Sequence, residues 1–290
     1  MSATVRVLTP LDPDWPDPLG DVLPRVASLW TLGDHALLEG PMVAVVGTRH
    51  PTEYGRRVTA QLVHALATAG VTVVSGLARG IDGIAHQTAL DAGGRTIAVL
   101  GTGVDVPYPA GHRGLHARIA SQGLVLSEMR PGTRAFAGCF PRRNRIIAGL
   151  ASVTVVVEAG VRSGAQNTAA AALAADRVVA AVPGPIDSPQ SAGTNLLIRD
   201  GAQIVTSIGD LFALAGLAPP DDERIEQRLT GDARVLWSAL AAATPRLDEL
   251  AELVALPIAR VLAGVTALEL DGHVSVGLDD RVRRAVPTRL

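Results

Sequence analysis

The feature that most restricts the fold of this chain is a series of short apolar runs separated by stretches of helical periodicity. The six runs are VAVVG (43–47), VTVVSG (71–76), TIAVLG (96–101), LVLSE (124–128), VTVVVEAG (153–160) and RVVAAVPG (177–184). Runs this short and this apolar are typical of parallel strands buried on both faces. Helices are expected between them, over 58–69, 81–92, 113–122, 142–150 and 165–175. The alternation predicts an α/β fold with a Rossmann-like, doubly wound, mostly parallel sheet.

The rest of the chain divides into shorter segments. Residues 1–41, rich in Pro and Asp, are expected to form an irregular lead-in with a short helix near 22–32. The Rossmann-like domain is expected over 42–216, with small elements near 194–200, 203–205 and 208–215 at its end. LAPPDDER (217–224) is interpreted as a linker. Residues 225–290 combine helical patterns near 232–243, 246–253 and 257–270 with a hairpin-like GHVSVGLDDRVRRAV, which predicts a small winged-helix domain.

Composition removes several kinds of chemistry. All 26 basic residues are arginine, so neither a Walker lysine nor a Schiff-base lysine can exist here. Cys139 is the single cysteine, which excludes an internal disulfide and a cysteine cage for a metal, and no metal site or other cofactor is expected. The chain has neither an apolar run of the roughly 18–20 residues that a membrane helix needs nor the layout of a signal peptide. We expect a cytoplasmic protein without membrane insertion.

The charge of the chain is distributed unevenly. The formal net charge is −2, yet residues 42–149 hold 12 arginines and five acidic residues, a local net charge of +7. The segments on both sides are acidic, and a binding partner responds to the local field rather than to the total charge. A basic first half of the sheet favours an anionic ligand.

Glycines and arginines follow the first two strands. GTR (Gly47, Thr48 and Arg49) comes directly after the first strand, where glycine allows a tight turn and arginine can bind a phosphate. SGLARGIDGIAHQTAL (75–90) follows the second strand. Its candidate ligand-binding residues are Gly76, Arg79, Gly80 and Asp82. Asp82 and His86, one helical turn apart, could also form a proton-transfer pair, although a structural hydrogen bond is the commoner arrangement.

The stretch SEMRPGTRAFAGCFPRRNRIIAGL (127–150) combines positive charge with aromatic rings. Arginines at 130, 134, 142, 143 and 145 alternate with Phe136 and Phe140. Guanidinium groups pair with phosphates and aromatic rings stack on bases, a combination that suits a single-stranded nucleic acid. The candidate binding residues here are Phe140, Arg142, Arg143, Asn144 and Arg145. The alternative is a solvated basic loop anchored by one phenylalanine.

Two further patterns bear on the ligand. Ser163, Gly164 and Thr168 open the helix after the fifth strand, where they could bind phosphate or serve as ordinary helix caps. The GxGxxG fingerprint fails at both 47–52 and 101–106, which disfavours a dinucleotide. Glu128 and Glu158 end strands and could form a carboxylate pair, but no recognised hydrolase motif accompanies them.

Taken together, these motifs resemble the DNA processing protein A family (DprA, also called Smf). The matching strings run in order: VAVVGTRHPTEYG, SGLARGIDGIAHQTAL, GTGVDVPYP, LVLSE, FPRRNRIIAGL, VVVEAG with SGAQNTA, and AVPG with GTNLLIRDGA. The resemblance covers about 42–205, and the tail resembles the family's winged-helix module. The family's N-terminal helical domain is expected to be truncated or missing. SGAQNTA departs from the more apolar string of many members, which leaves the roles of Gln166 and Asn167 open.

The resemblance implies a non-enzymatic protein of natural transformation. Such proteins bind incoming single-stranded DNA without sequence preference, protect it, counter single-strand-binding protein and load RecA, and they form homodimers through the Rossmann-like domain. The family's DNA pocket corresponds to Arg49, the Gly76–Gly80 loop and the Arg142–Arg145 segment. Since residues 221–290, which include the winged helix, have a net charge of −3, this part is expected to contact protein rather than DNA. The alternatives are a nucleotide-processing enzyme of phosphoribohydrolase-like fold and a double-stranded-DNA regulator that binds through its winged helix.

Overall fold

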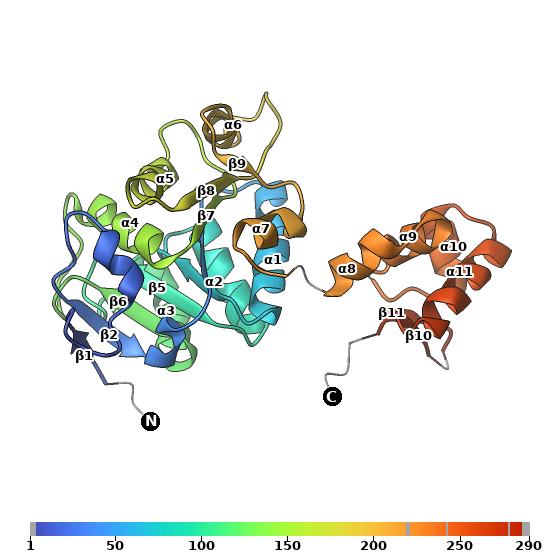
Figure 1. The fold of residues 1–290 in the computed structure, drawn as a ribbon, viewed down its shortest axis with the longest axis horizontal. Helices are drawn as coiled ribbons and strands as arrows, with labels where there is room; N and C mark the ends of the chain where they lie inside the picture. Colours follow the sequence, from blue (N-terminus) through green and yellow to red (C-terminus); the bar gives the residue numbers. More distant parts are fainter. Residues whose placement is uncertain (1–3, 219–220, 242, 278, 286–290) are drawn as a thin grey trace. The chain divides into compact units, whose positions relative to one another are not determined.

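The computed structural model describes residues 4–218, 221–241, 243–277 and 279–285. The chain divides into two compact units, Met1–Ala218 and Pro219–Leu290, each of which has its own hydrophobic core. Figure 1 shows the helices and strands of both units.

A nine-stranded sheet forms the centre of the first unit. Its strands are β1 (Arg6–Leu8), β2 (Leu29–Gly33), β3 (Met42–Val46), β4 (Thr72–Ser75), β5 (Thr96–Leu100), β6 (Leu124–Ser127), β7 (Val153–Val156), β8 (Val178–Ala181) and β9 (Gln203–Ile204). Their order across the sheet is β1-β2-β6-β5-β4-β3-β7-β8-β9. All pairs from β6 to β9 are parallel, whereas β1 and β2 add to one edge in antiparallel pairing. The predicted mostly parallel α/β sheet is confirmed.

The order of the strands reverses beside β3. From β3 the chain adds β4, β5 and β6 in one direction, and it then returns to place β7, β8 and β9 on the other side of β3. In open sheets of this kind, ligands bind beyond the carboxyl ends of the strands at the point of reversal. The topology therefore directs attention to the segments that follow β3, β4 and β7.

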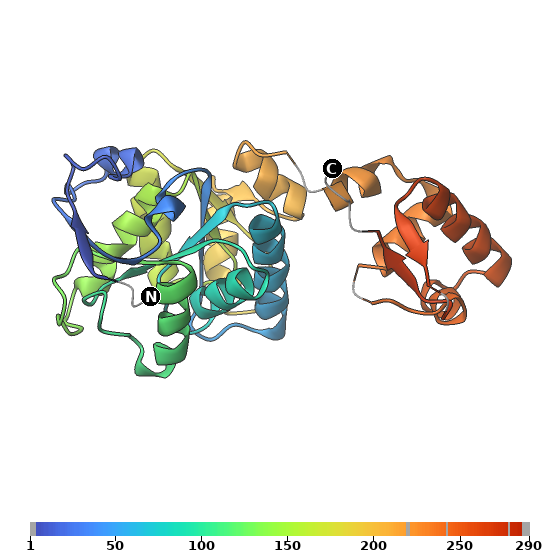
Figure 2. The same cartoon turned by 90° about the horizontal axis from the view of Figure 1, so that it is seen from below.

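Helices cover both faces of the sheet (Figures 1 and 2). They are α1 (Glu53–Thr68), α2 (Ile81–Asp91), α3 (Arg113–Gln122), α4 (Cys139–Leu150), α5 (Gly164–Ala174), α6 (Ala192–Arg199) and α7 (Ile208–Leu214). Side chains of α4, α5 and α6 pack into the apolar cluster on one face, and those of α1, α2, α3 and α7 pack into two clusters on the other. Successive strand residues alternate between the faces, so Val43 and Val45 lie on the side opposite Ala44 and Val46.

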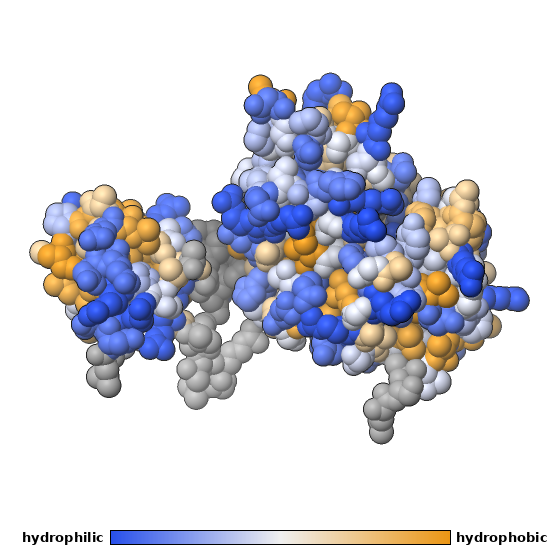
Figure 3. Space-filling view, turned by 180° about the vertical axis from the view of Figure 1, so that it is seen from behind, coloured by the Kyte–Doolittle hydropathy of each residue, from blue (hydrophilic) through white to orange (hydrophobic). Residues whose placement is uncertain are grey.

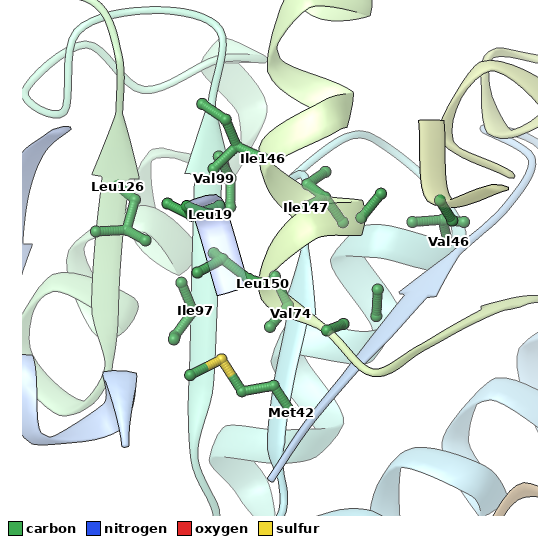
Figure 4. Packing of buried hydrophobic residues seen from close by; sticks show 14 of the residues in the cluster. Leu19, Met42, Val46, Val74, Ile97, Val99, Leu126, Ile146, Ile147 and Leu150 are labelled. Carbon is green, nitrogen blue, oxygen red and sulfur yellow. The ribbon is translucent and has the colours of Figure 1, made fainter. Parts of the chain in front are cut away.

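The α4 helix forms the tightest part of the core on its face. Ile146, Ile147 and Leu150 point onto β3, β4 and β5, where they meet Val46, Val74 and Val99 (Figure 4). All of these side chains are at most 3% exposed. Burial of an aliphatic side chain contributes about 1.5–3 kcal/mol. The N-terminal end of α4, which carries the arginines of 142–145, is thereby held at a fixed position.

The expectation of a separate lead-in over 1–41 with a helix near 22–32 was wrong. Residues 29–33 form β2, which pairs with both β1 and β6. In the structure, Leu29 and Thr31 are buried while Trp30 and Leu32 are half-buried, the period of two that belongs to a strand. A one-turn 3₁₀ helix lies earlier, at Asp17–Asp21. The segment completes the sheet and belongs to the first unit.

The second unit contains α8 (Asp221–Arg228), α9 (Gly231–Ala239), α10 (Leu247–Val254) and α11 (Ile258–Leu270), followed by β10 (Val274–Val276) and β11 (Val282–Arg284). Trp237, fully buried, lies in its core with Leu236, Leu250 and Val261. The three predicted helices and the hairpin are present. The proposed linker over 217–224 was wrong in its second half, because α8 begins at Asp221 and Ile225 packs against the core of the unit.

The surface in the space-filling view is mostly hydrophilic, with smaller apolar areas between the polar ones (Figure 3). Among the residues that the structure describes, no single helix has the length and apolar character to cross a membrane; one pair bent by 110°, Leu247–Val254 with Ile258–Leu270, meets these criteria by length and composition only.

Candidate nucleic-acid interface

Three segments meet at the point where the strand order reverses. The Thr48 N–H, just past β3, donates to the carbonyl of Glu158, just past β7, over 2.6 Å. The Thr48 carbonyl accepts from the N–H of Ile81, the first residue of α2, over 3.2 Å. One residue thus joins the ends of β3 and β7 to the start of α2. The carboxyl ends of the parallel strands lie along one side of the sheet, called here its carboxyl edge. The predicted motif Gly47–Arg49 lies at the centre of this edge.

The loop 76–80 after β4 is fixed by several hydrogen bonds. The Asp82 carboxylate accepts from the N–H groups of Gly76 (3.1 Å) and Ala78 (3.4 Å), and His112 Nδ1–H donates to the Leu77 carbonyl over 3.0 Å. Gly80 has φ +78°, and a side chain on it would collide with the backbone of Thr48 and Arg49. The loops that carry Arg49 and Arg79 are therefore in direct contact.

Arg143 supports the same loop from inside the molecule. Its side chain is buried, and Nη1–H groups donate to the carbonyls of Gly76 (2.6 Å) and Val99. A side chain at position 76 would overlap the guanidinium group. Burial lowers the pKa of Arg143 to about 10, so the group remains protonated at neutral pH. Burial also raises the pKa of Asp82, while the charge of Arg143 opposes that rise.

The side chains next to Arg143 along α4 also bind other groups of the protein. Arg145 is buried and donates to Glu128 over 2.7 Å, and the half-exposed Arg142 donates to the other oxygen of the same carboxylate over 2.9 Å. The Asn144 side chain accepts from Arg143 Nε (3.2 Å) and donates to the carbonyl of Gly164 at the start of α5 (3.4 Å). These contacts join the starts of α4 and α5.

The candidate residues therefore fall into two groups. Arg49, Arg79 and Arg142 are exposed, and Phe140 is half-buried. Asp82, Arg143, Asn144, Arg145 and Thr168 are at most 8% exposed. The expectation that Arg143 and Arg145 face a ligand does not fit their burial. Arg143 donates to the carbonyls of Gly76 and Val99. Arg145 donates to Glu128 through Nη2, while its buried Nε and Nη1 have no partner among the described residues. Sequence alone cannot separate the three arginines of FPRRNR, since burial is decided by the rotation of α4 against the sheet.

Ser163 and Gly164 begin α5 beside these residues. The Ser163 hydroxyl accepts from the Ala165 N–H over 3.3 Å, as an ordinary helix cap does. Gly164 is exposed, and no atom would contact a side chain placed there. Gln166, whose role the sequence left open, donates to the Gly193 carbonyl over 3.0 Å and ties α5 to α6.

Exposed arginines without a protein partner surround this edge. Within the described residues, Arg49, Arg79, Arg130, Arg134 and Arg162 make no side-chain hydrogen bond or ion pair. Three follow β3, β4 and β7, and two lie in the loop before α4. Guanidinium groups are the side chains best suited to pair with phosphates and carboxylates, so this edge is the candidate site for an anionic ligand.

Comparisons with known proteins identify the family of the chain. A family model described as DNA recombination-mediator protein A matches residues 6–216, and a model described as the DprA winged helix domain matches residues 218–276. The chain belongs to the DNA recombination-mediator protein A family. A relative in Mycobacterium tuberculosis H37Rv, "Putative DNA processing protein DprA", is 43% identical, with 92% of this chain and 74% of the relative covered.

Two solved structures of the family share the fold. DNA processing protein A from Streptococcus pneumoniae is 41% identical with a TM-score of 0.70, covering 72% of this chain and 74% of that one. The Helicobacter pylori protein is 31% identical with a TM-score of 0.66, covering 72% and 94%, and its structure is described as giving insight into a unique single-stranded DNA binding mode.

The proposed Asp82–His86 pair is not formed in this family member. Asp82 binds the 76–80 loop, whereas His86 Nδ1 lies 2.7 Å from Thr96 Oγ1. Burial lowers the pKa of His86 to about 3, so the ring is neutral. Glu158 is also committed: its carboxylate accepts from the N–H and the hydroxyl of Thr52 at the start of α1 (2.9 and 2.5 Å).

Tyr108, which was not among the candidates from the sequence, also belongs to this edge. Its ring lies 5.0 Å from that of Phe140, centroid to centroid. The signal in the sequence was the aromatic residue in GTGVDVPYP, directly after a strand end. Among the described residues, no group of three or more His, Cys, Asp or Glu is placed to hold a metal ion.

Proposed function

We propose that this chain binds single-stranded DNA without sequence preference along the carboxyl edge of its sheet and serves as a recombination mediator. The observation that carries the proposal is the position of Arg49 and Arg79. Both are exposed and free of protein partners within the described residues, and their loops are in contact beside the point of strand-order reversal. The proposed binding residues remain Gly47, Thr48, Arg49, Arg79, Gly80, Phe140, Arg142, Ser163 and Gly164, whereas Gly76 is buried, with its N–H bound to Asp82 and its carbonyl to Arg143. Asp82, Arg143, Asn144, Arg145 and Thr168 are proposed to act from behind this surface by fixing its loops.

The chemistry of this edge favours a polymer of phosphates and unpaired bases. Guanidinium groups bind phosphates whatever the base, which accounts for binding without sequence preference. Phe140, half-buried beside Arg142, offers an aromatic surface on which a base can stack. Bases in a duplex are stacked on their neighbours, so such a surface favours single strands.

The wider role rests on membership of the family. The H. pylori neighbour is described by its single-stranded DNA binding mode. By extension we propose that this chain acts in the cytoplasm during natural transformation, where it protects incoming DNA, counters single-strand-binding protein and loads RecA. The test is strand exchange by RecA on DNA already coated with single-strand-binding protein. Without stimulation by the chain, the loading role is wrong even if the chain binds DNA.

We propose a binding protein rather than a nucleotide-processing enzyme. The two carboxylates that could act in hydrolysis are engaged elsewhere: Glu158 binds Thr52, and Glu128 is held between Arg142 and Arg145. Incubation with nucleoside monophosphates should release no free base. Release of base above background would favour the enzyme.

The second unit is proposed to contact protein. Its helix α11, which occupies the place of a recognition helix, exposes Ile258 and Leu262, and its one arginine, Arg260, forms an ion pair with Asp232 at 2.5 Å. Such a face has few groups that could read base edges. This supports assigning DNA binding to the first unit.

We also propose that the first unit forms the homodimer. Exposed aliphatic side chains lie at the β8–β9 end of the sheet, among them Leu173 of α5 and Ile204 of β9. The molar mass measured by light scattering should be twice 29.9 kDa. Replacing Leu173 and Ile204 with Asp should reduce it to that of a monomer.

A salt titration tests DNA binding directly. The affinity for an oligo(dT) should exceed that for a duplex and fall steeply with salt, because each phosphate contact on a single strand contributes roughly 0.7 to the slope of log K against log salt. Arg49→Ala and Arg79→Ala should each weaken binding and reduce the slope by about 0.7. Arg95→Ala is the matched control: Arg95 is exposed but precedes β5, at the opposite edge of the sheet. Binding that does not depend on salt would contradict the proposal. So would a loss of affinity in Arg95→Ala equal to that in Arg49→Ala and Arg79→Ala.

A further inference from the structure

An aromatic pair lies on the same edge and takes no part in the core. The rings of Tyr108 and Phe140 are 5.0 Å apart and tilted by 35°. Tyr108 is 43% exposed, whereas Phe212, which packs in the core of the same unit, is 1% exposed. Within the described residues the Tyr108 hydroxyl makes no hydrogen bond. Neither burial nor hydrogen bonding therefore explains why an aromatic ring is present here.

The loop that carries Tyr108 is joined to the loop before α4. Gly103 N–H donates to the Thr133 carbonyl over 2.9 Å, and the Asp105 carboxylate accepts from Gly132 N–H at 2.7 and 3.0 Å. Thr102 closes the turn of the first loop by donating to the Val106 carbonyl over 2.7 Å. These hydrogen bonds fix the loop that carries Tyr108. Little conformational entropy of the loop would therefore be lost when a ligand stacks on the ring.

The position of Phe140 depends on the end of β5. A side chain on Gly101 would lie 3.2 Å from the Phe140 ring and equally close to Cys139. Glycine at this position lets the start of α4 approach the strand end, which brings Phe140 within contact distance of Tyr108. The pair therefore results from two segments far apart in the sequence.

We propose that Tyr108 and Phe140 together form a stacking platform for an unpaired base of the DNA, with Tyr108 as a further binding residue. The inference rests on the proposed single-stranded-DNA function and names a contact within that site. The exposed Arg130 and Arg134, on the loop joined to that of Tyr108, supply charge for the adjoining phosphates. An aromatic ring can stack on any base. It cannot stack on a base whose two faces are covered by its neighbours in a duplex.

Two substitutions of Tyr108 distinguish stacking on a base from a role in which Tyr108 only shields Phe140 from solvent. Tyr108→Phe keeps the ring, whereas Tyr108→Leu keeps an apolar side chain but removes the aromatic face. Tyr108→Leu should lower the affinity for a short oligo(dT) about ten-fold, the effect of one lost base–aromatic contact, and Tyr108→Phe should change it less than two-fold. The salt slope should stay the same in both, because no phosphate contact is removed. Leu11→Ala, which truncates an apolar side chain that is 96% exposed, is the control.

A second ligand makes the test specific to bases. An abasic oligonucleotide of equal length keeps every phosphate, so wild type and Tyr108→Leu should bind it equally. 2-Aminopurine in the oligonucleotide should show a fluorescence change on binding to wild type that Tyr108→Leu reduces. Urea unfolding of each variant identifies any loss that comes from the fold.

The failures of the two proposals can be told apart. If wild type binds oligo(dT) with the expected salt slope and Tyr108→Leu binds it equally well, stacking on Tyr108 is wrong and the DNA function stands. Stacking is likewise wrong if Tyr108→Leu loses as much affinity for the abasic strand as for oligo(dT). If wild type does not bind single strands, the proposed function itself is wrong, and the stacking proposal with it.

Discussion

The guanidinium group of Arg143 lies directly beneath Gly76, to whose carbonyl it donates over 2.6 Å. It approaches so closely that a side chain at position 76 would displace it. Asp82 holds the N–H of the same glycine over 3.1 Å. The buried Arg143 and Asp82 thus bind the carbonyl and the N–H of Gly76. The exposed Arg79 projects from the loop that these two hydrogen bonds fix.

Replacing Arg143 with Met should destabilise the first unit by about 3–5 kcal/mol. The change leaves the carbonyls of Gly76 and Val99 without their donor and Asp82 without its neighbouring charge. Urea unfolding measures the loss. Arg142→Met is the control, since Arg142 is 55% exposed and its ion pair with Glu128 should contribute about 1 kcal/mol or less. Similar unfolding midpoints for the two variants would contradict the supporting role of Arg143.

The buried His86 should make stability fall in mild acid. Its folded pKa of about 3 lies below the ordinary 6.5, so below pH 6.5 the unfolded chain takes up a proton that the folded chain does not. Stability is therefore lost as pH falls from about 6.5 toward 3, and the loss between pH 7 and pH 5 amounts to about 2 kcal/mol.

The contribution of His86 can be isolated with two variants. His86→Gln should lack this part of the pH dependence in urea unfolding at pH 7 and pH 5. His64→Gln, at an exposed position of α1, should retain it. The raised pKa of Asp82 acts in the opposite direction, because a carboxyl that protonates more readily when folded gains stability as pH falls. The comparison therefore uses the difference between variants. Equal pH dependence in wild type and His86→Gln would contradict the prediction.

Glu158→Gln should cost about 2 kcal/mol of stability. The carboxylate accepts two hydrogen bonds from Thr52 at the N-terminus of α1, where negative charge is favoured, and an amide brings a donor into the place of one acceptor. Unfolding by urea provides the measurement. Glu53→Gln, in the first turn of the same helix and 96% exposed, should change stability by less than about 0.5 kcal/mol. A cost no greater than that of the control would show that Glu158 has little structural role.

A chain that ends at Pro220 should keep its affinity for single-stranded DNA within about two-fold. The second unit has a core of its own around Trp237, and the proposed binding residues all belong to the first unit. Fluorescence anisotropy at matched salt measures the affinity of both chains. A loss of ten-fold or more would return the winged helix to consideration as a DNA-binding element.

The sequence predicted the parallel strands of the sheet well, but it did not predict the antiparallel strands β1 and β2 at one side of it. Strands such as Val153–Val156 are buried on both faces, so their apolar runs stand out without any knowledge of their neighbours. β2 was missed because Leu29–Gly33 is partly exposed and its apolar residues do not form an uninterrupted run, and its pairing with β6 involves residues nearly a hundred positions away. The start of α8 was missed because acidic residues after two prolines are typical of a linker as well as of a helix N-terminus.

The candidate site was located by sequence, but the roles within it were not. Arg49 and Arg79 follow strand ends, and the parallel topology alone brings such ends to one edge. In FPRRNR, by contrast, one turn of α4 distributes Arg142, Arg143 and Arg145 between the surface and the interior. Tyr108 gained its place only from the contact with Phe140, across 32 positions of sequence.

By itself the sequence determined the α/β architecture, the basic carboxyl edge and the family, because periodicity, local charge and ordered motifs are properties of the chain. The tertiary structure decided which charged groups face solvent and which support the loops. A buried arginine and an exposed one have the same letter, and only the packing around Arg143, which removes its guanidinium from water and surrounds it with carbonyl oxygens, distinguishes it from Arg49.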